Sequence, residues 1–125
     1  MDFSEAIQSG FKNYINFNGR TSRSGYNYWI LFGVIISIIT MVLDIMFFPL
    51  FVFSIEGSGP LNTISGLIFL LPNFSIGIRR LHDINKSGWN LLWAFTFIGL
   101  IPLIYWSYFK AGDKGDNLYG TDPLA

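Results

Sequence analysis

The stretch WILFGVIISIITMVLDIMFFPLFVF, residues 29–53, contains no Lys or Arg and a single acid, Asp44. As a helix it would extend about 37 Å, whereas the hydrocarbon core of a bilayer is about 30 Å thick. The stretch is therefore long enough to cross a membrane. It is also longer than an upright helix needs, so we expect it to tilt or to break near Pro49. It predicts a first membrane span over residues 28–53.

Two further uncharged runs follow, over residues 61–78 and 89–109. As helices they would extend about 27 and 31 Å, close to the thickness of the hydrocarbon core. None of the three runs has a sustained polar face, which argues against buried helices of a soluble protein. The sequence predicts an all-α membrane protein with three transmembrane helices, at residues 28–53, 61–78 and 89–109.

Composition supports this class. Charged residues make up 13% of the 125-residue chain, about half of the roughly 25% typical of globular proteins. Eight Lys and Arg balance eight Asp and Glu, which excludes a nucleic-acid binder with a basic footprint. The absence of Cys excludes disulfides and thiolate chemistry. With a single His, a metal site would need carboxylates, and these are scattered among segments at different membrane levels, so no metal site is expected. We expect one membrane domain, residues 1–125, without a cofactor.

The segment before the first span has a different pattern. Phe3, Ile7, Phe11 and Ile15 recur every four residues among polar ones, which predicts an amphipathic helix over residues 2–17. Two placements stay open: this helix lies on the membrane surface, or it packs on the protein's own loops. At the other end of the chain, residues 110–125 form a polar tail.

The distribution of Lys and Arg predicts the orientation. Three precede the first span, three lie between the second and third runs, and none lies in residues 54–60. By the positive-inside rule the N-terminus is expected in the cytoplasm. Three spans would then place the tail, with its two lysines, outside. A hidden fourth pass or an inverted chain would place the tail inside.

The sequence RRLHDINKSGW, residues 79–89, holds the densest cluster of polar residues. A helix continuing past residue 78 would present Arg79, His82, Asp83 and Lys86 on one face, toward water or phosphates. Three interpretations compete. The cluster is a cytoplasmic turn with Arg79 and Asp83 paired; it binds anionic lipid headgroups; or His82 acts as a general base oriented by Asp83. Adjacent residues diverge by about 100° on a helix, which disfavours the third interpretation.

Lipid or partner binding is the leading hypothesis, and catalytic residues are not assigned. Its predicted contact residues are Arg20, Arg23, Arg79, Arg80, His82, Asp83 and Lys86.

Polar residues also lie inside the predicted spans. Asp44 would lie about 24 Å along the first helix, near the outer surface, where an acid can reach water, so a proton relay is disfavoured. Hydrogen bonds between helices are the expected role of Ser37, Thr40, Ser65, Asn73 and Ser75. In the tail, Asp, Asn and Gly residues superficially resemble a calcium loop, but turn formation explains them without an ion.

Three motifs in this order resemble the domain-of-unknown-function 805 family of small bacterial inner-membrane proteins. They are Gly19-Arg20-Thr21-Ser22-Arg23, then Arg79-Arg80-Leu81-His82-Asp83 with Ser87-Gly88-Trp89, and finally residues 115–123, GDNLYGTDP. Two positions depart from the family pattern: Gly25 stands where an acid is frequent, and Asn90 where an aromatic residue is frequent. The resemblance implies an integral, multi-pass plasma-membrane protein. It implies no established activity and transfers no catalytic residue.

The function expected from the sequence is non-enzymatic. The basic cytoplasmic face would bind anionic lipid headgroups or a partner protein in the bacterial inner membrane. Two alternatives stay open: a homo-oligomeric transporter or channel component, and a membrane enzyme that acts on lipid phosphates.

Overall fold

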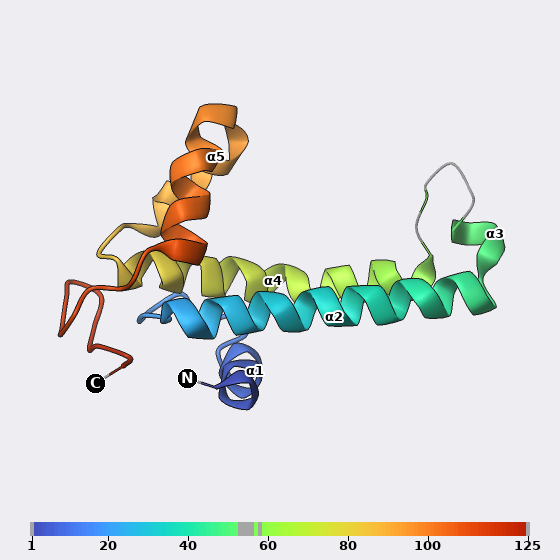
Figure 1. The fold of residues 1–125 in the computed structure, drawn as a ribbon, viewed down its shortest axis with the longest axis horizontal. Coiled ribbons are helices and arrows are strands. Elements are labelled where there is room, and N and C mark those ends of the chain that lie inside the picture. The colour runs from blue at the N-terminus through green and yellow to red at the C-terminus, as the bar shows by residue number, and fades with distance from the viewer. Residues whose placement is uncertain (1, 53–56, 58, 125) are drawn as a thin grey trace.

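The computed structural model describes residues 2–52, 57 and 59–124, and this part of the chain folds into helices and connecting segments without a β-strand. Its two long helices, α2 (Arg23–Phe47) and α4 (Pro60–Asp83), lie side by side and antiparallel (Figure 1). Both are long and apolar enough to cross a membrane. Most α2 side chains in its apolar part face outward, as expected for a helix surrounded by lipid.

Helix α2 begins and ends where local chemistry dictates. Ser22 caps it by accepting a hydrogen bond from the Gly25 amide at 3.1 Å. The helix stops at Phe47, and the short helix α3 (Pro49–Val52) starts at Pro49. The expected break near Pro49 is confirmed. The predicted end of the first span at residue 53 lies outside the described residues.

The predicted amphipathic helix is α1 (Phe3–Lys12), shorter than the expected range 2–17. It crosses α2 (Figure 1), and its apolar face partly packs there: a side chain at Gly10 would place its Cβ 2.1 Å from the Trp29 ring. Glycine is therefore required for this close approach. Phe11 and Ile15 nevertheless stay 44% and 67% exposed. One part of the apolar surface of this segment therefore packs against α2, and the exposed part is available to contact lipid.

Residues 89–109 differ from the expected single helix. They form the 3₁₀ helix η1 (Gly88–Phe95), the α-helix α5 (Phe97–Ile104) and the π-helical turn η2 (Tyr105–Phe109). Thr96 interrupts the run with an extended backbone and caps α5 by accepting a hydrogen bond from the Gly99 amide at 3.0 Å. The continuous apolar part, Phe97–Phe109, would extend only about 20 Å, short of the hydrocarbon core.

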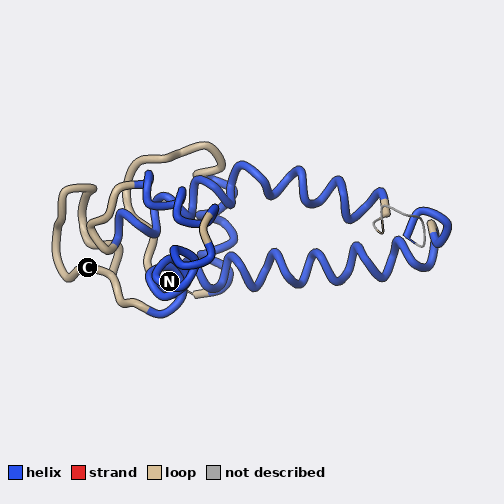
Figure 2. Tube along the Cα trace, turned by 90° about the horizontal axis from the view of Figure 1, so that it is seen from above, coloured by secondary structure: helices blue, strands red, loops and turns tan. Residues whose placement is uncertain are grey.

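The three segments η1, α5 and η2, here called the hairpin, run out from the end of α4 and return to it. In Figure 1 the hairpin lies crosswise to α2 and α4, on the side opposite α1. Leu103 of α5 packs with Leu81 and Ile84 in a small apolar core. Because the chain returns, the tail lies at the same end of the molecule as α1. Figure 2 shows that the long helix pair extends away from α1, the hairpin and the tail toward the other end, where α3 lies.

Candidate functional site

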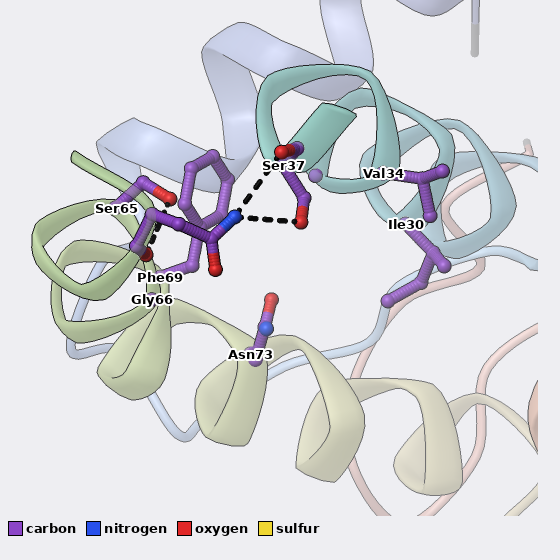
Figure 3. A pocket seen from close by; sticks show the side chains of 9 residues that line it. Ile30, Val34, Ser37, Ser65, Gly66, Phe69 and Asn73 are labelled. Atoms are coloured by element: carbon purple, nitrogen blue, oxygen red, sulfur yellow. Dashed lines mark hydrogen bonds between the residues drawn. The ribbon is translucent and has the colours of Figure 1, made fainter. Parts of the chain in front are cut away.

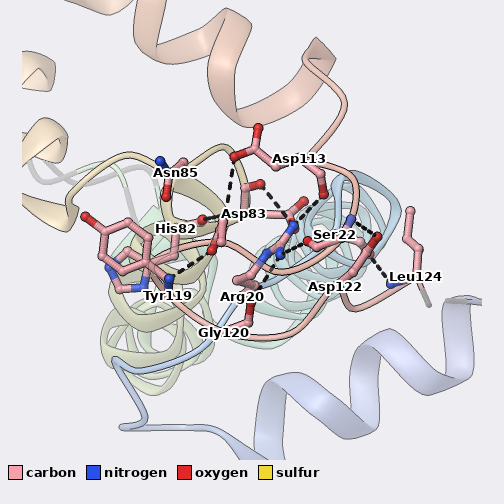
Figure 4. Close-up of polar contacts among 12 residues, drawn as sticks. Arg20, Ser22, His82, Asp83, Asn85, Asp113, Tyr119, Gly120, Asp122 and Leu124 are labelled. Carbon is pink, nitrogen blue, oxygen red and sulfur yellow. Dashed lines mark hydrogen bonds and ion pairs between the residues drawn. The ribbon is translucent and has the colours of Figure 1, made fainter.

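The polar residues of the first, second and third sequence motifs meet at the end of the molecule that holds α1, the hairpin and the tail, here called the charged end. Its centre is Asp83, the last residue of α4. One carboxylate oxygen accepts a hydrogen bond from Arg20 Nε at 3.0 Å (Figure 4). The other accepts one from Arg80 Nη1 at 3.2 Å. The side chains of Arg20, Arg80 and Asp83 are 1%, 0% and 3% exposed. The network is a buried cluster with two cations and one anion.

Arg20 joins three segments that are far apart in the sequence. Besides Asp83, it donates to the carbonyls of Asp113 and Gly115, both at 2.6 Å, and of Gly120 at 3.3 Å. The Asp113 amide in turn donates to the Asp83 carbonyl at 2.8 Å. Backbone carbonyls therefore satisfy the guanidinium donors that the carboxylate does not reach.

The two adjacent arginines of α4 hold different segments. Arg80 donates from Nε to the Ser107 carbonyl at 3.0 Å and from Nη2 to the Lys110 carbonyl, which ties down the end of the hairpin. Arg79 donates from Nη1 to the carbonyls of Asn13 and Asn16, at 2.9 and 2.7 Å, which ties down the segment after α1. The expected pairing of Arg79 with Asp83 is wrong, because Arg79 points toward the α1 side and Arg20 and Arg80 occupy the carboxylate.

His82 and Asp83 are not joined to each other. His82 Nδ1 lies 2.9 Å from the Gly19 carbonyl, so this nitrogen carries the proton of the neutral ring. The ring stacks on Tyr119 with centroids 4.1 Å apart. Asp83 accepts from arginines instead. The geometry required for a general base oriented by Asp83 is therefore not present among these two side chains.

The tail is held in place by turn chemistry. Asn117 Oδ1 accepts a hydrogen bond from the Tyr119 amide at 2.9 Å, while its Nδ2 donates to the His82 carbonyl at 2.9 Å. Asp122 accepts from the amides of Leu124 and Gly115, at 2.9 and 2.8 Å, and these two bonds hold the pKa of its carboxyl below the usual range. These contacts match the turn interpretation of the Asp and Asn residues.

The structure thus brings together five of the seven predicted contact residues: Arg20, Arg79, Arg80, His82 and Asp83. They are buried, which contradicts the expectation that this face of α4 meets water or phosphates. The other two lie at the surface. Arg23 is exposed and donates to the Phe109 carbonyl at 2.7 Å. Lys86 follows the end of α4, so it does not share the helix face, and its ammonium lies 4.6 Å from the Trp106 ring.

Sequence reasoning did not single out Thr21, Ser107, Asn117 and Tyr119 as individual contacts. Thr21 accepts from Arg79 Nε at 3.1 Å, and Tyr119 covers His82. Thr21, Asn117 and Tyr119 belong to the first and third motifs, so the motifs themselves were the available signal. Ser107 accepts the Arg80 hydrogen bond with its backbone carbonyl, and a carbonyl leaves no trace in the side-chain pattern.

A second polar region lies between α2 and α4, from the first turn of α4 to Asn73. Asn62 Nδ2 donates to the Ser37 carbonyl and hydroxyl, at 3.1 and 3.3 Å (Figure 3). It also donates to Thr40 Oγ1 at 3.1 Å. Trp29 Nε1 donates to Asn73 Oδ1 at 2.8 Å. Beside these bonds a cavity of about 280 Å³ opens, with Gly33 and Gly66 in its wall. The expected hydrogen bonds between helices are confirmed for Ser37, Thr40 and Asn73.

The remaining two polar residues bond differently. Ser65 donates within α4, to the Asn62 carbonyl at 3.1 Å, and Ser75 donates to the Tyr14 carbonyl at 3.1 Å, in the segment after α1. Over the residues that the structure describes, no three His, Asp or Glu side chains lie close enough to hold a metal ion.

Comparison with known proteins places the sequence in a family. Residues 14–121 match the family described as "Protein of unknown function (DUF805)". The chain is 38% identical over 117 residues to inner membrane protein YhaH of Escherichia coli K12, and the alignment covers 90% of each chain. It is 34% identical over 122 residues to inner membrane protein YhaI of the same strain, with 92% of each chain covered. No solved structure matches.

Proposed function

The chain belongs to the DUF805 family, and we propose on that basis that it is a non-enzymatic, two-span membrane protein that holds lipids of the cytoplasmic leaflet. Its relatives are inner membrane proteins, and this protein resides in the inner membrane too. The proposal adds that both termini lie in the cytoplasm, that α1 and the hairpin lie in the cytoplasmic leaflet, and that exposed cations bind anionic headgroups.

One observation carries the proposal: all eight Lys and Arg belong to segments of the charged end. Six of the eight acids belong there as well, so the charged end has a net charge of +2, whereas Asp44 lies near the opposite end of α2. The positive-inside rule then favours the charged end in the cytoplasm. A three-span topology would place the tail, with its two lysines, outside the cytoplasm. Because the hairpin returns to the end of α4, two spans suffice, and the tail then lies in the cytoplasm.

Burial changes which cations can bind headgroups. Arg20, Arg79 and Arg80 are committed to the internal network, so they support the fold of the charged end. Lys12, Lys86 and Lys110 are partly or fully exposed, and each lies next to the end of a helix of the charged end. Each such cation near an anionic leaflet is worth about 1 kcal/mol. The geometry therefore supports moderate, salt-sensitive lipid binding. The alternatives of an enzyme or a channel component have no comparable support.

The two-span topology predicts a labelling pattern. Because the natural chain has no Cys, a single introduced Cys is a unique reporter. With a membrane-impermeant maleimide, we expect Gly57→Cys to react in intact cells and Leu118→Cys, which replaces a side chain 84% exposed in the tail, to react only after lysis. Reaction of Leu118→Cys in intact cells at the rate of Gly57→Cys would establish three spans and overturn the two-span proposal.

Headgroup binding predicts a loss of anionic lipid on removal of surface charge. The test is native mass spectrometry from mild detergent with added phosphatidylglycerol. We expect the triple variant Lys12→Gln/Lys86→Gln/Lys110→Gln to retain fewer lipids than the wild type, because its binding free energy for the anionic lipid is weaker by up to about 3 kcal/mol. The control Lys114→Gln removes one exposed tail cation, and its binding free energy should weaken by about a third of that value or less. Equal lipid retention in the triple variant and the wild type would refute headgroup binding by these cations.

A further inference from the structure

The protein is far wider at the charged end than at the opposite end. At the charged end α1 and the hairpin flank α2 and α4 on opposite sides, whereas at the other end, among the residues that the structure describes, the short helix α3 accompanies the long pair (Figures 1 and 2). In the proposed topology, on which this inference rests, the wide end occupies the cytoplasmic leaflet. The two leaflets would therefore accommodate different amounts of protein.

The crosswise elements lie at the depth of the outer acyl region of one leaflet. Phe3 of α1 contacts the rings of Tyr28 and Phe32 in α2, with centroids 5.9 and 6.5 Å apart. Ile104 of α5 lines a groove together with Ile30 and Val34 of α2. From Trp29 to Phe47, α2 would cover about 28 Å, close to the hydrocarbon thickness. Contacts at Tyr28–Val34 thus place α1 and the hairpin at the first turns inside that layer.

The tip of the hairpin is apolar and uncovered by the protein. Phe95, Phe97 and Ile98 are 87%, 93% and 86% exposed. Phe95 ends η1 and the other two begin α5, and the residues between Trp89 and Phe109 carry no charge. Lipid is the occupant that fits this surface, because the tip is apolar like the outward faces of α2 and α4 and carries no charged residue. The tip therefore inserts among acyl chains, as shallow amphipathic elements do.

We propose that the protein senses membrane curvature: it favours bilayers whose cytoplasmic face is convex. Two crosswise elements enlarge the area of one leaflet, while α3 adds little to the other. A bilayer bent outward on the enlarged side relieves this mismatch, because that leaflet already has the larger area and looser packing there. The same asymmetry makes the preference depend on orientation, so inverted molecules prefer the opposite curvature.

The test uses the full chain labelled with a fluorophore at Leu118→Cys. It is reconstituted into neutral phosphatidylcholine vesicles of about 50 and about 200 nm diameter, so that headgroup charge does not contribute. A membrane-impermeant quencher separates molecules with the tail outside from those with the tail inside. We expect the density of tail-outside molecules to be about twofold or more higher on the small vesicles, and that of tail-inside molecules to be lower. Equal densities for both orientations at both diameters would overturn the proposal.

A matched pair of variants assigns the effect to the hairpin. Ile98→Ser and Leu50→Ser each remove an isomeric apolar side chain, 86% and 89% exposed, from opposite ends of the molecule. We expect Ile98→Ser to bring the density ratio toward one and Leu50→Ser to leave it unchanged or larger. If the two respond alike, the hairpin does not carry the preference. If labels at positions 57 and 118 lie on the same side of the vesicle, the two-span topology itself has failed.

Discussion

Replacing Asp83 by Ala is expected to lower the free energy of unfolding by about 3–5 kcal/mol, the largest effect of any charge removal in this chain. The substitution leaves Arg20 and Arg80 buried without their shared anion, at 3.0 and 3.2 Å from the missing oxygens. Uncompensated burial of charge is costlier than loss of the ion pair itself. The loss is measured by equilibrium unfolding in mixed micelles with increasing dodecyl sulfate. Faster tryptic cleavage after Lys114 would report release of the tail.

The matched control is Asp116→Ala, which removes an exposed acid from the same tail. Its expected effect is within about 0.5 kcal/mol, as for other surface substitutions. Arg20→Lys adds a second check, because a Lys keeps the charge but cannot reach Asp83 and three carbonyls together. Equal stability of Asp83→Ala and Asp116→Ala would mean that the buried network does not hold the charged end together.

The sequence identified the residues of this network but not their burial. Arg20, Arg80 and Asp83 stand out by type, and the motif order that resembles the family already linked their segments. The donors of Arg20, however, are satisfied by carbonyls of residues 113, 115 and 120, which lie up to 100 positions away. A backbone carbonyl has no side-chain signature. Local patterns therefore predicted a solvated basic face where the fold builds an internal one.

The third apolar run shows a different limit of sequence reasoning. Hydropathy averages over residues 89–109 are insensitive to a single cap, and Thr96 is an ordinary residue in a transmembrane helix. Its role depends on Gly99, where a Cβ would lie 2.4 Å from Thr96 Oγ1 and 2.7 Å from the Trp93 carbonyl. Only a residue without a side chain permits this tight turn. The apolar run that composition predicts as one span is thus divided by helix caps at Ser87 and Thr96 and by the small residue Gly99.

Asp44 is a case in which position was predicted correctly and environment was not. The sequence places it near the outer end of the first span, with access to water. In the structure it lies one turn from the end of α2, as expected, but it is 0% exposed. Its carboxylate accepts hydrogen bonds from the amides of Leu61 and Asn62, at 2.9 and 2.8 Å, so it caps the first turn of α4. Gly59 passes so close that its Cβ would lie 2.3 Å from the carboxyl carbon.

Replacement of Asp44 by Ala is therefore expected to cost about 3 kcal/mol, because two amides at a helix N-terminus lose a charged acceptor in a buried site. Asp44→Asn keeps one carbonyl acceptor and should lose about half as much. The comparison is Asp2→Ala, which removes the exposed cap of α1, bonded to the Glu5 amide at 2.8 Å, and should cost about 1 kcal/mol or less. Unfolding in mixed micelles measures all three variants. A loss at Asp44→Ala no larger than at Asp2→Ala would show that this acid does not join the two long helices, and would reopen a functional role for its charge.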